Sequence, residues 1–328
     1  MADRRTFLRT LAGGAVAGPL AAAAQTSRPP LIGYLGPPDS VGPFRHEFQR
    51  GLAELGYVEG RNVHVEYRYN VAVDGNLDRL AELAAELVKL RPDLLVVSLT
   101  EVAVAARQAT TTIPIVMANV ADPVAAGLVQ SLPRPGGNVT GISRQTPELV
   151  AKHIQLLKEM LPRTARVGLL LNSPDRMRPV IVGAVKETAD SLGVRSTVLA
   201  PGTAAEIEAA FATLRGERAD AVLVLGGGMF FLTRMRIAEL AMNARLASMF
   251  EFREAVHAGG LLSYGASSAV NYRRTAYFID RILRGANPAG LPVEQPSAFQ
   301  LVVNLRTAKS LGVAIPQSIL LRADEVIA

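Results

Sequence analysis

The sequence predicts an α/β fold of two similar lobes, each built on a parallel sheet. The first observation is RPDLLVVSLT, residues 91–100, a charged turn followed by an apolar run that stops at small polar residues. Such a run suits a strand covered on both faces, and ERADAVLVLGGG, residues 217–228, repeats the pattern. The second observation is that strand and helix signals alternate through both halves, which implies parallel strands with right-handed crossovers.

The first half alternates short apolar runs with longer segments of helical spacing, such as the leucines 80, 83, 87 and 90 on one helix face. Glycine or proline residues end several of these segments. We expect strands at 31–35, 63–69, 93–98, 115–118 and 139–142, and helices at 43–55, 77–90 and 100–109, with a short helix through Leu128 and Leu132.

The second half repeats this order and then adds elements of its own. We expect helices at 147–161, 179–192, 206–215 and 233–244, strands at 166–171, 195–199, 220–225, 246–250 and 260–264, and a flexible exit at 226–228. Beyond these, a helix at 271–284, a connector rich in Pro and Gly at 285–296, a strand at 299–304 and helices at 305–311 and 320–327 complete the chain.

Equivalent signals mark the two halves. Leu55-Gly56 and Leu192-Gly193 each end a helix, and Asp93 and Asp220 each precede an apolar strand. The equivalents lie roughly 130 residues apart, which suits one domain each. The elements after the second half indicate that the chain crosses between lobes more than once. We therefore predict one lobe from 28–143 plus about 266–295, and another from 144–265 plus about 296–328.

Composition excludes several classes of function. The 328 residues are 49% hydrophobic and 20% charged, so the chain can bury a large core. The net charge of +6 is scattered without a basic block, which argues against a nucleic-acid partner. No Cys is present, which excludes disulfides and thiolate chemistry, and the four His lack metal-pair spacing. We expect no metal and no cofactor.

Residues 1–24 have the layout of an export signal, with paired arginines at 4 and 5, an apolar stretch and an Ala-x-Ala end. We expect cleavage near Ala24, and residues 3–9 resemble the twin-arginine export motif. The alternative is a buried N-terminal helix, which the glycines at 13, 14 and 18 and the proline at 19 disfavour. No later apolar run reaches the ~20 residues that span a membrane. The mature protein is expected to be soluble and periplasmic.

Five segments of the mature chain resemble one group of bacterial substrate-binding proteins of ABC transporters, which has tryptophan- and tyrosine-binding members. The segments are LAELGYVEGRNVHVEYR, TTTIPIV, DPVAAGLVQSLPRPGGNVTG, GGLLSYG and PVEQPSAFQLVVNLRTAKSLGVAIPQSIL. The resemblance implies two Rossmann-like lobes of the type I periplasmic-binding-protein kind, joined by a three-segment hinge. It also implies closure over one small ligand without chemistry, and delivery to a membrane permease. We expect a monomer.

Ligand residues are expected where strands of the first lobe end, because open parallel sheets bind ligands beyond their carboxyl edges. Thr100 is a candidate ligand contact or a helix N-cap. Asp122 either accepts an ammonium group or caps the turn before Pro123. Ser40, in a loop of Pro and Gly, is a ligand contact or an ordinary turn residue.

The second lobe offers Asn172, Gly228, Glu251 and Tyr264. Glu251 ends an apolar strand, where it either holds the ligand or pairs with a neighbour such as Arg253. Tyr264 either stacks on a ligand ring or packs in the hinge. The glycines at 226–228 could admit close backbone approach to a phosphate, but no Lys-Ser/Thr follows, so they do not form a P-loop.

Three functions fit a two-lobed chain. The first is an exported binding protein for a small amino-acid-like or carboxylate ligand, aromatic ligands included. The second is a cleft transferase or hydrolase with Asp122 and Glu251 as acid and base, although no GxSxG, HExxH or Cys/His constellation is present. The third is a ligand-sensing regulator, which would need a DNA-binding helix-turn-helix where the export signal lies. The first is preferred, and we expect no enzymatic activity.

Overall fold

The computed structural model describes residues 28–36, 44–69, 77–144, 147–171 and 178–328. Its first sheet contains five strands in the order β2-β1-β3-β4-β5, all of them parallel. The strands are β1 (Leu31–Gly36), β2 (His64–Tyr69), β3 (Leu94–Ser98), β4 (Ile115–Ala121) and β5 (Val139–Arg144).

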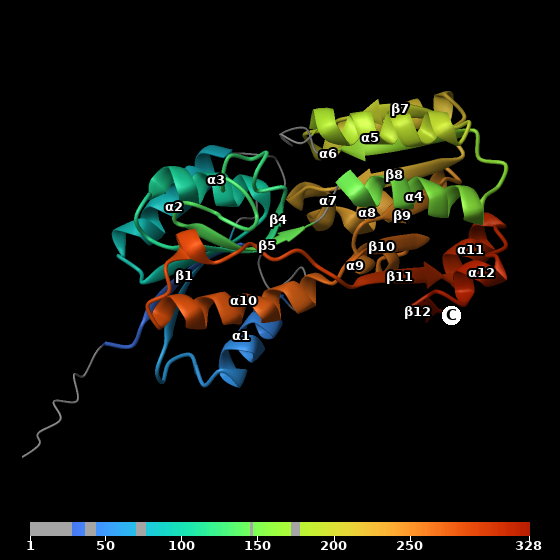
Figure 1. Ribbon diagram of the computed structural model, residues 1–328. Coiled ribbons are helices and arrows are strands. Elements are labelled where there is room, and N and C mark those ends of the chain that lie inside the picture. Colours follow the sequence, from blue (N-terminus) through green and yellow to red (C-terminus); the bar gives the residue numbers. More distant parts are fainter. Residues whose placement is uncertain (1–27, 37–43, 70–76, 145–146, 172–177) are drawn as a thin grey trace, which may run out of the picture.

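Helices cover both faces of this sheet, because its central strands are apolar on both sides. One hydrophobic cluster packs α2 (Leu77–Lys89) and α3 (Thr100–Ala109) on one face. Another packs α1 (Phe44–Glu54) and α10 (Ser268–Leu283) on the opposite face, and these two helices lie side by side (Figure 1). We call this sheet with α1, α2, α3 and α10 the first lobe.

The second sheet has seven strands in the order β12-β11-β10-β9-β8-β6-β7. Its neighbours are parallel except for β10 and β11, which run antiparallel. The strands are β6 (Arg166–Leu171), β7 (Arg195–Leu199), β8 (Ala221–Leu225), β9 (Ala247–Phe250), β10 (Leu262–Ala266), β11 (Phe299–Asn304) and β12 (Glu325–Ile327).

The second lobe is this sheet with its covering helices, which form one hydrophobic cluster on each face. One face carries α4 (Pro147–Met160), α5 (Arg178–Ser191), α11 (Leu305–Leu311) and α12 (Gln317–Leu320). The other carries α6 (Ala204–Gly216), α7 (Gly228–Leu232), α8 (Arg234–Asn243) and α9 (Arg253–His257). In the described part of the chain, no helix is long and apolar enough to cross a membrane.

The chain passes between the lobes after β5, after β10 and before β11, the last through a short 3₁₀ turn, η2 (Pro288–Gly290). Backbone hydrogen bonds join the first and third passages: Ser143 N donates to Glu294 O at 2.8 Å, and Glu294 N donates to Gly141 O at 2.9 Å. The second passage is joined to the third because Arg274 on α10 forms an ion pair with Glu294 at 2.7 Å. The three passages therefore form one connected hinge region.

The expected internal repeat is visible in how each central strand begins. Asp93 Oδ2 accepts a hydrogen bond from Leu31 N at 2.7 Å, which ties the start of β3 to β1. Asp220 Oδ2 accepts from Ala165 N at 2.8 Å and from Arg166 N at 2.9 Å, which ties the start of β8 to β6. The same side chain thus makes the same kind of link in both lobes.

Three sequence predictions were wrong. Residues 123–133 form turns rather than a helix through Leu128 and Leu132, because Asp122 caps a turn there and prolines at 123 and 133 flank it. The segment 320–327 is not a helix: α12 ends at Leu320 and β12 adds a strand beside β11. The glycine run at 226–228 is not merely a loop, because α7 begins at Gly228, and the short helix α9 was also missed.

Candidate functional site

Contacts between the lobes bring the carboxyl ends of the two sheets together. Leu99 follows β3, and a Cβ atom added to Gly228, which follows β8, would lie 2.6 Å from Leu99 Cδ1. Arg144 ends β5, and its Nη1 lies 3.6 Å from Glu251 Oε2, just beyond β9. This boundary is where open parallel sheets place ligand-binding residues.

Glu251 is the most deeply buried carboxylate at the boundary, with 3% of its side chain exposed. Its Oε2 accepts a hydrogen bond from Gly226 N at 2.6 Å and faces Arg144. Among the described residues, no donor reaches Oε1, and Arg144 Nε is also buried without a partner. The expected neighbour Arg253 does not pair with Glu251, because it points to Glu325 instead. A buried carboxylate oxygen and a buried guanidinium N–H thus remain for a further polar group.

Tyr264 lies in the part of the second lobe that is next to the hinge region. Its ring stacks on Phe299 with centroids 5.8 Å apart, and His153 meets it edge-on at 6.2 Å. His153 Nε2 donates to Tyr264 O at 2.5 Å. These side chains belong to α4, β10 and β11, the three segments of the second lobe next to the passages. Tyr264 therefore packs in the hinge region.

His153 is fully buried, and burial lowers its pKa, while the charge of Glu251 and the hydrogen bond to Tyr264 O act in the opposite direction. A neutral imidazole with its proton on Nε2 satisfies the contact to the Tyr264 carbonyl. The ring nitrogen Nδ1 has no hydrogen-bond partner among the residues that the structure describes. A neutral histidine thus lies near the charged pair of Glu251 and Arg144.

Thr100 is the first residue of α3 rather than its N-cap, which is Leu99. Its hydroxyl donates to Ala121 O at 3.3 Å and is 3.2 Å from Ala121 N, which donates to it. Thr100 thus fastens the start of α3 to the end of β4. Because Leu99 has no side chain that can cap, the start of α3 carries no side-chain cap.

Asp122 caps the turn after β4, since Oδ1 accepts from Val124 N at 3.1 Å and from Ala125 N at 3.0 Å. Its backbone has φ of 22°, an uncommon value for a residue other than glycine. The turn-capping role expected for Asp122 is therefore present. Ser40 and Asn172, the two remaining candidates, lie outside the described residues.

Sequence reasoning missed a group of aromatic side chains at the boundary. Phe44 stacks on Tyr272 at 5.0 Å and lies 5.3 Å from Phe231, which belongs to the other lobe. Phe231 in turn lies 5.1 Å from Phe252. Burial raises the pKa of Tyr272 to about 12, and its hydroxyl donates to Ser98 Oγ at 2.5 Å. The positions of Phe44 and Phe231 next to Pro/Gly-rich segments were the available signal.

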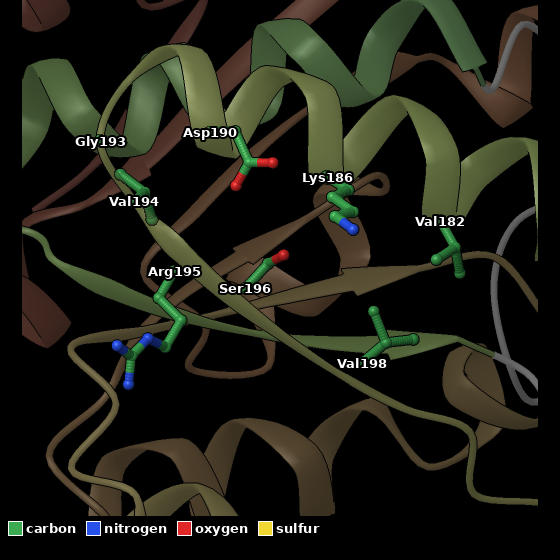
Figure 2. A pocket seen from close by; sticks show the side chains of 8 residues that line it. All are labelled: Val182, Lys186, Asp190, Gly193, Val194, Arg195, Ser196 and Val198. Atoms are coloured by element: carbon green, nitrogen blue, oxygen red, sulfur yellow. The ribbon is translucent and has the colours of Figure 1, made fainter.

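A separate open hollow of about 600 Å³ lies on the second lobe between α5 and β7. Figure 2 shows Lys186 and Asp190 of α5 above Arg195 and Ser196 of β7. It is lined by neither Glu251 nor the aromatic group and holds both charge signs, so it offers no defined ligand chemistry. Within the described ranges, no three His, Asp or Glu side chains are placed to hold a metal ion.

Known proteins share this architecture along nearly the whole chain. The curated tyrosine-binding protein of Clostridioides difficile (strain R20291) is 25% identical over 268 residues, which cover 80% of this chain and 75% of that protein. A solved structure of an ABC domain from Streptococcus pneumonia in complex with L-Trp is 28% identical. It covers 91% of this chain and 99% of its own, with a TM-score of 0.84.

A third relative superposes less well on this chain than the L-Trp complex does. The ligand-free, open structure of a substrate binding protein with adhesive properties from Clostridium difficile is 25% identical. It covers 91% of this chain and 99% of its own, as the L-Trp complex does, but its TM-score is 0.67. Over the same share of this chain, the whole structure therefore superposes more closely on the L-Trp complex than on the open structure.

The family profile described as ABC transporter substrate binding protein matches residues 38–327. The two α/β lobes have the architecture of type I periplasmic binding proteins. The predicted resemblance and fold class are thus confirmed, and this chain belongs to the ABC transporter substrate binding protein family.

Proposed function

We propose that this protein is the exported solute-binding component of an ATP-driven importer. It captures a small amino-acid-like ligand, aromatic amino acids included, in a cleft between the lobes and delivers it to a membrane permease. The similarity to a tyrosine-binding protein and to an L-Trp complex supports this ligand class. We propose no catalytic step, and binding rather than turnover is the expected activity.

The observation that carries the ligand class is the unpaired oxygen of Glu251. Leaving a buried carboxylate oxygen without a donor is costly, and a ligand ammonium group supplies a charged donor. Arg144 places its opposite charge beside this carboxylate and offers Nε to a ligand acceptor. An α-amino acid carries both groups on the same carbon atom.

Both lobes add contacts for the same ligand carboxylate and for a side-chain ring. The start of α3 carries no side-chain cap, and the backbone N–H groups there favour a carboxylate. Phe44, Phe231, Phe252 and Tyr272 gather at the same boundary, so an aromatic ring has partners although aromatic residues make up only 5% of the chain. An aromatic amino acid thus fits better than an aliphatic one.

The division of the chain and its location belong to the same proposal. Residues 28–143 with about 266–295 form one lobe, and 144–265 with about 296–328 form the other. Residues 1–24 are an export signal, with the twin-arginine route preferred, so the mature protein acts in the periplasm. We also propose that it acts as a monomer. Size-exclusion chromatography with light scattering tests the oligomeric state. Export of a reporter fused to residues 1–30 tests the export signal.

The ligand is tested by thermal shift on mature protein that has been unfolded and refolded to remove carried-over ligand. The panel compares L-tryptophan, L-tyrosine, L-phenylalanine and L-leucine with indole-3-propionate, which lacks the ammonium group, and tryptamine, which lacks the carboxylate. Binding to the folded state alone stabilises it by about 2.7 kcal/mol at a hundredfold excess over Kd. We expect a shift with the aromatic zwitterions and little with either analogue.

The role of Glu251 is tested by Glu251→Gln, with the exposed Glu239→Gln as the matched control. We expect Glu251→Gln to weaken binding of L-tryptophan while leaving the weak response to indole-3-propionate unchanged. Loss of binding in Asp122→Asn but not in Glu251→Gln would move the ammonium site to Asp122. No shift across the panel would reject the proposed ligand class.

A further inference from the structure

Three glycines in a row follow β8, and they have different reasons to be glycine. Gly226 and Gly227 have φ of 73° and 75°, a region that residues with a Cβ atom avoid. Gly228, the first residue of α7, has no such φ. Alanine is a better helix residue than glycine by about 1 kcal/mol, so the backbone does not explain Gly228.

Space explains Gly228. An added Cβ atom would lie 2.6 Å from Leu99 Cδ1, well inside van der Waals contact, and Leu99 belongs to the other lobe. Leu99 itself has φ of 73° and ψ of 149°, a conformation usual only for glycine and costly for leucine. A large side chain in a strained conformation therefore meets the one residue type that leaves room for it.

A second contact from α7 holds the lobes together. Phe231 lies 5.3 Å from Phe44, which stacks on Tyr272 of the same lobe. Phe231 is the side chain shared by a hydrophobic cluster of the first lobe and a cluster of the second. One short helix thus provides both a tight steric contact and an apolar contact across the boundary.

We propose that α7 sets the closed arrangement of the lobes: Leu99 against Gly228 is the stop that fixes how near they come, and Phe231 against Phe44 is the contact that holds them there. This inference rests on the proposed function, in which the lobes close over a ligand. The whole structure fits the L-Trp complex with a TM-score of 0.84 and the open relative with 0.67, which agrees with such contacts.

The fraction of the protein that is closed determines how tightly the ligand binds. A ligand that needs the closed state has an apparent Kd equal to its intrinsic Kd divided by the closed fraction. A bulkier residue at 228 lowers that fraction through its contact with the Leu99 side chain. Because Leu99 Cδ1 is the far end of a flexible side chain and can move aside, alanine at 228 has a small effect and valine a larger one.

The test uses the absence of native cysteine. Ala85→Cys on α2 and Ala212→Cys on α6 are exposed sites in different lobes, and two dyes there report the distance between lobes with and without L-tryptophan. The variants are Gly228→Ala, Gly228→Val, Leu99→Ala, Phe231→Ala and the double variant Leu99→Ala with Gly228→Val. Gly183→Val is the matched control, because nothing lies within 4 Å of a Cβ atom at Gly183.

We expect Gly228→Val to lengthen the distance between the lobes in the unliganded protein and to weaken L-tryptophan binding about tenfold, with Gly228→Ala about twofold. Leu99→Ala in the double variant restores the distance between the lobes and brings the Kd for L-tryptophan to within about twofold of the parent. Loss of folding would not allow this recovery. Phe231→Ala also lengthens the distance. Gly183→Val changes neither readout.

The proposal is overturned if Gly228→Val leaves the distance unchanged, or if Leu99→Ala does not restore it. The distance in the unliganded protein separates this result from the proposed function. If L-tryptophan does not bind but the distances change and are restored as expected, the ligand proposal fails and the closure contact stands.

Discussion

The two lobes have the same backbone where their central strands end, but different side chains. Leu99 after β3 has φ of 73° and ψ of 149°, and Gly227 after β8 has φ of 75° and ψ of 132°; each is the N-cap of the next helix. At the opposite ends of the strands, Arg91 and Arg218 also match, with φ of 52° and 55°. The lobes therefore share one frame and differ where they face each other.

This difference shows where each lobe carries its specific role. The ends far from the boundary keep the same residue types, since Asp93 and Asp220 both tie their strand to its neighbour. At the boundary, the first lobe offers a bulky Leu99 and the second a run of glycines that receives it. The shared backbone provides the scaffold, and the unequal side chains provide the fit between the lobes.

The largest expected effect is at Gly227, where the second lobe needs glycine for its backbone. Gly227→Ala forces a Cβ atom into φ of 75° and ψ of 132°, so we expect a loss of about 2 kcal/mol in the free energy of unfolding. Urea unfolding followed by circular dichroism measures it. A loss no larger than that of Gly183→Val would mean that the two strand ends do not share a strained backbone.

The next effect compares the two aspartates. Asp220→Ala removes two backbone hydrogen bonds and is expected to cost about 2 kcal/mol, whereas Asp93→Ala removes one and is expected to cost about 1 kcal/mol. Both variants are compared by the same urea titration. Equal losses would show that the second hydrogen bond at Asp220 adds nothing to stability.

The two lobes should differ in how acid affects their contribution to stability. His153 is buried in the second lobe, whereas His64 in the first lobe is exposed. Burial lowers the folded-state pKa of His153 below the value of about 6.5 in the unfolded chain. As the pH falls below that value, the unfolded state binds more protons than the folded state. The stability that a neutral His153 contributes is therefore fully present above pH 7. It should fall as the pH drops through 6.5, by at most about 1.4 kcal/mol per pH unit for one proton.

His153→Gln keeps a donor for the Tyr264 carbonyl but does not titrate, so we expect a flatter stability profile as the pH falls below 6.5. The pH profile of the melting temperature measures this. Glu251 is the charged side chain that acts on His153. His64→Gln should retain the wild-type slope, and an unchanged slope in His153→Gln would assign the acid response to other groups.

The smallest effect isolates the strain at Leu99. Leu99→Gly and Leu99→Ala both remove the side chain, but only glycine relieves φ of 73°. We expect Leu99→Gly to be more stable than Leu99→Ala by about 1 kcal/mol, against the usual order in which glycine is the less stable of the two. Thermal unfolding of the two variants side by side measures this difference. If Leu99→Gly is less stable than Leu99→Ala, the backbone at this position is not strained.

Much of the fold could be predicted because its signals are local. The helix at 100–109 and the strands at 166–171, 195–199 and 299–304 have the predicted bounds, since apolar periodicity and breakers define them. The errors arose where a distant partner decides. The segment 325–327 becomes a strand only because β11 offers an edge, and α7 forms from a glycine run because Phe230 and Met229 bury themselves against the second sheet.

The candidate residues divide in the same way. Sequence alone determined that Glu251 ends an apolar strand and that Thr100 and Gly228 follow equivalent strands, because parallel sheets place strand ends at one edge. Only the tertiary structure decided that Arg144 reaches Glu251, that Tyr264 packs in the hinge and that Leu99 meets Gly228. These are contacts between segments about 30 to 130 residues apart, and no local pattern of hydrophobicity records which distant side chains will meet.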